Sequence, residues 1–261
     1  MAMSNWSLTD VTWPTRLGTP AAIALHFWQH LRTTLTVRRL WPYLLLTVLP
    51  IIAAAGLARL ALDDSSAVGR FYQHFAMRAL ALCALGLGTA AIREDAEAGA
   101  LPLLLLKPRA ALALPVGRLL AVAAVVGALG AVMMAGSTLL LLGTAYSPEI
   151  GYIVRQFLAA IFGGLAWAGI FVALGTLFKA GTALGLGFMV VVDLLMAQWV
   201  DLAAKVSPST YIGILVQTLP GKDLVAANTA DQIPGAVVAL TVLGVIGGAV
   251  AVLRLQRDVP Q

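Results

Sequence analysis

Charged residues and cysteines are scarce in this sequence. Among its 261 residues, 11% are charged and 60% are hydrophobic, whereas an ordinary soluble domain has about 25% charged residues. Water is therefore not the main solvent of this chain. Cys83 is the single cysteine, which excludes an intrachain disulfide and a thiolate metal cluster. We interpret it as a small packing residue in a membrane protein.

The chain also has little polar sequence between its apolar runs. The hydrophilic segments are mostly short, and none is long enough to bury a core of its own. No phosphate-binding loop of the form G-x-x-x-x-G-K-[ST] is present, because Pro220-Gly221-Lys222-Asp223 lacks the first glycine, the hydroxyl residue and a preceding strand. We therefore predict no enzyme activity and no cofactor in this chain.

Histidine is rare as well, with only His26, His30 and His74. None lies deep in an apolar run, which argues against catalysis inside a membrane. His26 and His30 are four residues apart on a predicted helix, but no nearby acidic or cysteine ligand completes a metal site. His74 lies near the outer end of an apolar run, which leaves a haem-handling permease as an alternative.

Several apolar runs reach the roughly 20 residues that a membrane-spanning helix needs. They predict an all-α, polytopic membrane protein with six transmembrane helices. The third run is long enough to tilt or to extend beyond the bilayer. The predicted spans are 41–62, 72–92, 113–143, 153–177, 181–200 and 233–253.

Basic residues are distributed unevenly about these spans. With a cytoplasmic amino terminus, more of them fall on the inner side, so the positive-inside rule places both termini in the cytoplasm. Their position beside apolar runs explains the net charge of +5 without nucleic acid as a partner. The inner residues are Arg16, Arg32, Arg38, Arg39, Arg93, Lys107, Arg109, Arg118, Lys179, Arg254 and Arg257, and the outer ones are Arg59, Arg70, Arg155, Lys205 and Lys222.

The segment before the first span has helical periodicity. Apolar residues at Ile23, Phe27, Leu31 and Leu35 are spaced by four, so residues 21–39 predict an amphipathic helix. We expect it to lie along the membrane surface before the chain turns inward at Trp41-Pro42, with a plain helical linker as the alternative. The domains are then a cytoplasmic segment 1–40, a permease domain 41–254 and a cytoplasmic tail 255–261.

The connection between the second and third spans is the most distinctive passage. An acidic turn with Arg93, Glu94 and Glu97 is followed by Gly99 and then by an apolar segment that ends at Lys107-Pro108. A solvated loop explains the charges but not the four consecutive leucines, which need a cover. We expect a short helix that protrudes at the cytoplasmic face and docks a partner.

This passage resembles the coupling region of the ABC type-2 permease family. The pattern of a charged Glu-containing element, a Gly-Thr-Leu-like step and a Leu-rich segment before a Pro-containing turn is matched by Glu94, Glu97, Gly99, Leu101, Leu104 and Pro108. Ala100 stands where the family often has threonine, so the subfamily does not follow. The order of the entry helix, the spans and an outer Ser207-Pro208 segment extends the resemblance over most of the chain.

The resemblance implies the membrane subunit of an exporter in a bacterial inner membrane. Such a permease pairs with an identical or related permease and with two cytoplasmic ATPase subunits, which bind ATP and magnesium. Residues 93–109 would receive the stroke of those subunits, with Arg93 among the coupling residues. Membrane lipid surrounds the spans, and the resemblance leaves open a periplasmic accessory protein.

Asp193 lies within an apolar run, where a charged carboxylate costs several kcal/mol unless it is paired, hydrated or protonated. Arg78, in the second span, is a candidate partner. The pair could stabilise one conformation or line a polar route. An ion- or proton-coupled secondary transporter that uses Asp193 is therefore the alternative function, although the two halves of the chain show no inverted repeat. The segment from 201 to 231 is the longest outer connection, and it could carry short re-entrant or interfacial helices.

Overall fold

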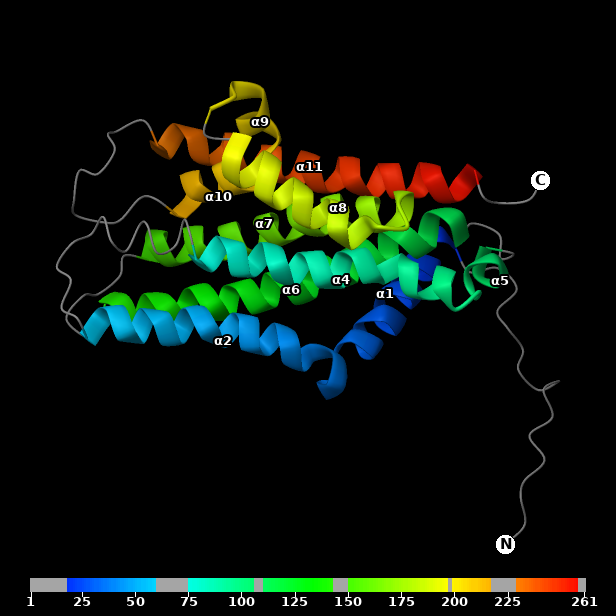
Figure 1. The fold of residues 1–261 in the computed structure, drawn as a ribbon, viewed down its shortest axis with the longest axis horizontal. Coiled ribbons are helices and arrows are strands. Elements are labelled where there is room, and N and C mark those ends of the chain that lie inside the picture. The colour runs from blue at the N-terminus through cyan, green and yellow to red at the C-terminus, as the bar shows by residue number, and fades with distance from the viewer. Residues whose placement is uncertain are drawn as a thin grey trace, which may run out of the picture.

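The computed structural model describes residues 18–59, 75–105, 110–142, 150–196, 199–216 and 229–257. Within these ranges every regular element is a helix, which confirms the all-α prediction for this part of the chain. The long helices run side by side along the longest axis of the molecule (Figure 1). The elements are α1 (Thr19–Thr34), α2 (Val37–Arg59), α4 (Met77–Glu97), α5 (Leu101–Leu105), α6 (Ala110–Leu142), α7 (Ile150–Leu177), α8 (Gly181–Gly187), the π-helix η3 (Phe188–Leu195), α9 (Asp201–Val206), α10 (Pro208–Val216) and α11 (Thr229–Arg257).

Four of the described helices are long and apolar enough to cross a membrane. A span needs roughly 20 apolar residues, and each of these helices supplies more than that. Their ranges overlap the first, third, fourth and sixth predicted spans. The spanning stretches are Val37–Ala58, Ala110–Leu140, Ile153–Leu177 and Gln232–Arg257. The chain thus has the features of an all-α membrane protein.

The other two predicted spans have a different character. Helix α4 overlaps the range 72–92 but continues to Glu97, so that its last two turns are charged. The range 181–200 is divided into α8 and η3, and its apolar stretch Gly181–Asp193 is shorter than a full span. A π-helix is rare and often marks a functional position. Residues 60–62, 72–74, 143 and 197–198 of the predicted spans lie outside the described residues.

Helix α7 forms the centre of the bundle. It packs against α4, α6, α10 and α11. The fully buried rings of Trp167 and Phe171 stack with their centroids 5.2 Å apart, and Phe188 of η3 meets Trp167 edge-on. These side chains join the central helix to the π-helix that carries Asp193.

Glycines allow α7 and α11 to approach closely. A Cβ added at Gly247 would lie 2.3 Å from the backbone of Gly169, and one added at Gly169 would lie 2.5 Å from the carbonyl oxygen of Gly244. No side chain fits at such distances. Small residues bring membrane helices into this kind of backbone contact.

The break between the first two helices lies earlier in the sequence than expected. Helix α1 ends at Thr34, and α2 begins at Val37, so the predictions of a helix to residue 39 and a turn at Trp41-Pro42 are wrong. The hydroxyl of Thr36 donates to the Thr33 carbonyl at 2.9 Å, and its own carbonyl then accepts from the backbone of the next helix. Threonine hydroxyls compete with helical hydrogen bonds in this way, whereas Pro42 is accommodated inside α2.

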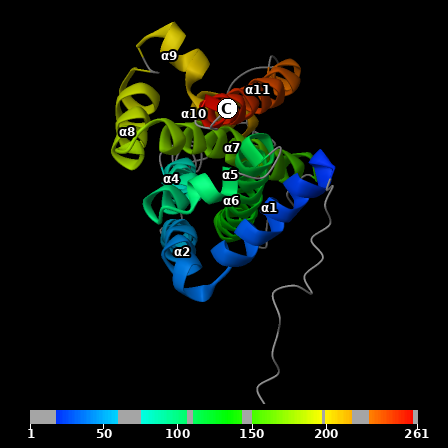
Figure 2. The same cartoon turned by 90° about the vertical axis from the view of Figure 1, so that its right-hand side faces the viewer.

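One end of the bundle gathers the elements predicted to face the cytoplasm. Helices α1 and α5 and the carboxyl end of α11 lie together there, as the view along the bundle shows (Figure 2). Helix α1 crosses α6 at Gly117, where an added Cβ would lie 2.7 Å from the Ile23 carbonyl oxygen. The amphipathic helix therefore packs directly on a long apolar helix.

Candidate functional sites at the two ends of helix α4

Helix α4 carries polar side chains near both of its ends. Arg78 is its second residue, and Arg93, Glu94 and Glu97 are in its last two turns. Sixteen residues separate Arg78 from Glu94, which corresponds to about 24 Å along a helix. The residues between them are almost all buried and apolar. The two ends thus form separate sites joined by one rigid element.

At the first end, the structure brings Arg78 and Asp193 together. Arg78 Nη1 lies 2.5 Å from Asp193 Oδ2, and the Asp193 side chain is completely buried. The pair links α4 to the π-helix η3. Because its partner is an arginine, this carboxylate meets the requirement that a buried charge be paired.

Two serines complete the shell around Asp193. Ser207 donates its hydroxyl to Oδ1, and Ser209 donates its hydroxyl to Oδ2 at 2.8 Å and its backbone N–H to Oδ1 at 3.3 Å. The Ser207 oxygen also accepts the N–H of Thr210 at 3.4 Å, as the N-cap of α10 does. The carboxylate therefore ties three elements, α4, η3 and α10, to one point.

The sequence did not predict that these serines contact Asp193. Val206-Ser207-Pro208 predicted only a break in the outer segment. A serine before a proline at a helix start is a capping signal, and it could have located α10. It could not have revealed the contact with a carboxylate fourteen residues earlier.

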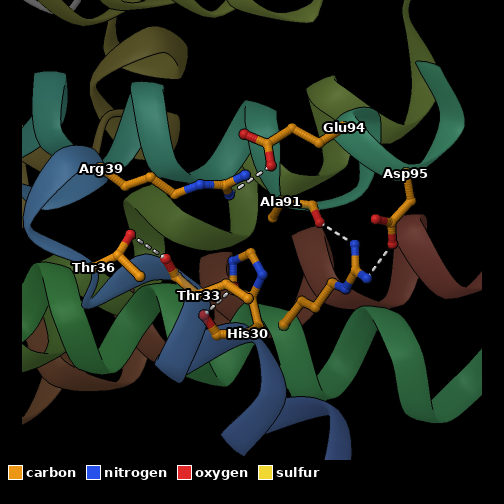
Figure 3. Close-up of polar contacts among 8 residues, drawn as sticks. His30, Thr33, Thr36, Arg39, Ala91, Glu94 and Asp95 are labelled. Carbon is orange, nitrogen blue, oxygen red and sulfur yellow. Dashed lines mark hydrogen bonds and ion pairs between the residues drawn. The ribbon is translucent and has the colours of Figure 1, made fainter. Parts of the chain in front are cut away.

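At the other end of α4, acidic residues pair with bases from three helices. Arg93 Nε lies 2.5 Å from Glu97 Oε1 within α4, and Arg39 Nη1 of α2 lies 2.6 Å from Glu94 Oε2. Figure 3 shows Arg39 extending from α2 towards Glu94. Both pairs are partly exposed. We call the ion pairs at this end of α4 the charge ladder.

The most buried pair of the charge ladder joins Arg118 to Asp95. Arg118 of α6 donates to the Asp95 carboxylate and to the backbone carbonyl of Ala91, so that one guanidinium holds two successive turns of α4. The side chains of Arg118 and Asp95 are 12% and 27% exposed, whereas those of Arg39 and Glu94 are 50% and 48% exposed. Asp95 was not among the predicted coupling residues. Its partner is 23 residues away on another helix, so no local pattern reveals the contact.

The predicted coupling residues Gly99, Leu101 and Leu104 follow the end of α4. Gly99 has φ of +69°, the left-handed conformation that commonly ends a helix. The short α5 follows, with Leu101 and Leu104 partly buried against the core and Leu103 69% exposed. The core thus covers part of the leucine run and leaves an apolar tip. Pro108 lies outside the described residues.

His30 of α1 lies beside the charge ladder. Burial, with the nearby positive charge of Arg118, lowers its pKa to about 4, although Asp95 opposes the shift. Its Nε2 atom is buried without a hydrogen-bond partner. His30 is therefore neutral at pH 7 and cannot serve as a cationic partner. No group of residues that could hold a metal is found in the described part of the chain, at His26 and His30 or elsewhere.

Two open grooves flank the charged end of α4. One, of about 750 Å³, is lined by residues that include Thr89, Glu94 and Thr182, whereas the other, of about 520 Å³, includes Leu101 and Arg254. Arg93, Glu97 and Lys179 line both. This end therefore combines charged grooves with the exposed Leu103 of α5. No family model matches this chain, and no curated protein matches it.

Proposed function

We propose that this chain is the membrane-spanning permease subunit of an ATP-binding cassette exporter. Energy would come from a separate cytoplasmic ATPase, and a second permease copy or a related permease would complete the transport route. The observation that carries the proposal is the end of α4, where a charged helix ends at the left-handed Gly99 and is followed by the short α5 with its exposed Leu103. The charge ladder connects this end of α4 to α2 and α6.

The proposal requires α4 and the α8–η3 segment to serve as the second and fifth of six spans. The Arg78–Asp193 pair supports this, because it neutralises the charges that would otherwise oppose burial in lipid. The charge ladder then lies at the cytoplasmic surface of a bacterial inner membrane, with both termini on that side. Lipid surrounds the apolar faces.

The docking face in this proposal consists of α5, the last turns of α4 and the turn before α8. Its exposed Leu103 offers an apolar anchor, and Arg93, Glu97 and Lys179 around the two grooves offer a polar rim. Protein interfaces commonly combine an apolar centre with such a rim. Movement of this face would reach α6 through Arg118 and α2 through Arg39. That path is the proposed route of mechanical coupling.

The test begins with purification of the full chain in mild detergent, identification of its companions by mass spectrometry, and ATPase assays with and without them. We expect an ATPase to co-purify and its activity to depend on the complex. A chain without companions and without nucleotide-dependent activity would refute the proposal. That result would favour the ion-coupled alternative centred on Asp193.

Coupling is tested with Glu94→Gln and Glu97→Gln in the same complex. We expect ATP hydrolysis to continue while transport falls, because the stroke would no longer be transmitted. Lys205→Gln is the matched control, since it removes one exposed charge from α9, which lies away from α5 (Figure 1). Normal coupled transport in both glutamate variants would contradict the assignment of these residues.

A further inference from the structure

Gln156 of α7 has an unusual environment for an amide. It is 3% exposed, and neither Nε2 nor Oε1 has a hydrogen-bond partner. A buried amide without partners is unfavourable, and such groups are rare in native proteins. The side chain therefore has an unmet capacity to donate and to accept a hydrogen bond.

A cavity lies beside this amide, between the last turns of α6 and the first turns of α7. Its volume is about 190 Å³. Ala131 and Ala135, one helical turn apart, leave the space on α6, and Ile153 and Phe157 form the wall on α7. The wall is almost entirely apolar, and no ionisable side chain is among its described residues.

The cavity opens at the side of the bundle. Leu139 is 69% exposed and Phe157 43%, on a surface that lipid would cover in a membrane. Gln156 is in the first turn of the spanning stretch Ile153–Leu177, so it lies near the boundary between hydrocarbon and headgroups. From Leu139 back to Ala131 the cavity follows α6 for about 12 Å towards the bilayer centre.

We infer that this cavity is a binding site for a neutral amphiphile with a hydroxyl or amide group on a short chain or ring. The polar group would bond to the Gln156 amide near the interface, and the apolar body would fill the space along α6. A dry apolar cavity of about 150 Å³ accepts a ligand the size of benzene, so this one has room for such a body. The inference does not depend on ATP-driven transport.

The experiment uses the full chain in lipid nanodiscs and an analogue of 1-octanol that carries a photoreactive diazirine. Labelled peptides are identified by mass spectrometry. We expect labelling of the α6–α7 peptides that contain the cavity residues, and we expect 1-octanol to compete about fivefold better than n-octane, as one neutral hydrogen bond predicts. Equal competition by the two compounds would refute the role of the amide.

Variants separate binding from general labelling by an apolar compound. Gln156→Leu should weaken labelling about fivefold and raise the melting temperature of the ligand-free chain by about 2–4 °C, because it removes an unpartnered amide. Ser137→Ala is the matched control: Ser137 is also buried without a partner but does not line the cavity. Its labelling should match the wild type.

Filling the cavity gives the last test. Ala135→Phe should abolish labelling, and Ala131→Leu serves the same purpose if the larger substitution prevents folding. Melting curves establish which variants are folded. Unchanged labelling in a folded cavity-filling variant would overturn the proposed site.

Discussion

The two ends of α4 present the same chemical groups in opposite surroundings. At its start, one arginine faces one carboxylate, whose side chain is fully buried and also accepts from two serines. At its end, the charge ladder has two partly exposed pairs, Arg39–Glu94 and Arg93–Glu97, beside the more buried Arg118–Asp95 pair. Loss of one partner costs more stability in a buried pair, because the remaining charge has no solvent to stabilise it. In an exposed pair, solvent screens the charges and the loss is small. The first site is therefore suited to hold helices in place, and the second is suited to move.

The largest expected effect comes from breaking the buried pair on one side only. Arg78→Met leaves the Asp193 carboxylate without its cation, which should lower the free energy of unfolding by about 3–5 kcal/mol. The double variant Arg78→Met with Asp193→Leu should recover most of the loss, because an apolar pair needs no desolvated charges. Thermal denaturation in one detergent measures both. A double variant as unstable as the single one would show that the pair is not the source of stability.

A smaller effect is expected at the buried part of the charge ladder. Arg118→Ala removes the donors to Asp95 and to the Ala91 carbonyl, and should destabilise the chain by about 2 kcal/mol. Arg39→Ala is its control, because that pair is half-exposed and its loss should lower stability by less than about 1 kcal/mol. Equal effects of the two variants in thermal denaturation would contradict the difference in burial.

Lowering the pH should destabilise the chain at the charge-ladder end of α4, where His30 lies. Its pKa of about 4 lies below the ordinary 6.5, so between these values the unfolded chain binds more protons than the folded one. Stability from this group is therefore present above pH 6.5 and is lost as the pH falls towards 4. At pH 5.5 the loss should be about 1 kcal/mol. His30→Leu should flatten the melting temperature between pH 7 and 5.5 relative to wild type, and an unchanged slope would refute the assignment.

The smallest effect on stability is expected for Glu94→Gln. It removes one exposed charge pair, so the free energy of unfolding should change by less than about 1 kcal/mol. The same substitution is expected to impair coupled transport. Thermal denaturation beside the transport assay therefore separates a transmission defect from misfolding. A large loss of stability would mean that this end of α4 is as structural as the other.

The hydrophobic pattern of the sequence predicted the helices whose formation depends on neighbouring residues alone. Apolar runs located four helices of membrane-spanning length, and the all-α class is confirmed in the described residues. The break at Thr36 was missed because it depends on hydroxyl contacts, whereas Trp41-Pro42 offered a stronger visible signal. The number of spans and the docking function remain predictions.

Of the two ion pairs that join distant residues, the sequence predicted one and missed the other. Asp193 and Arg78 were paired in advance because charges inside apolar runs are few and need partners. The Arg118–Asp95 pair could not be predicted in this way, because many basic residues lie beside the spans and each was an equally good candidate partner for Asp95. Ser207 and Ser209 were hidden because serine is unremarkable in a connection.

The contact among Gly169, Gly244 and Gly247 limits how this bundle can change shape. With backbones this close, α7 and α11 cannot slide past each other or twist apart without a collision or a void. We therefore expect the two helices to move as a single rigid body in any change of shape. Spin labels placed on α7 and α11 should therefore keep a constant separation in every state of the protein.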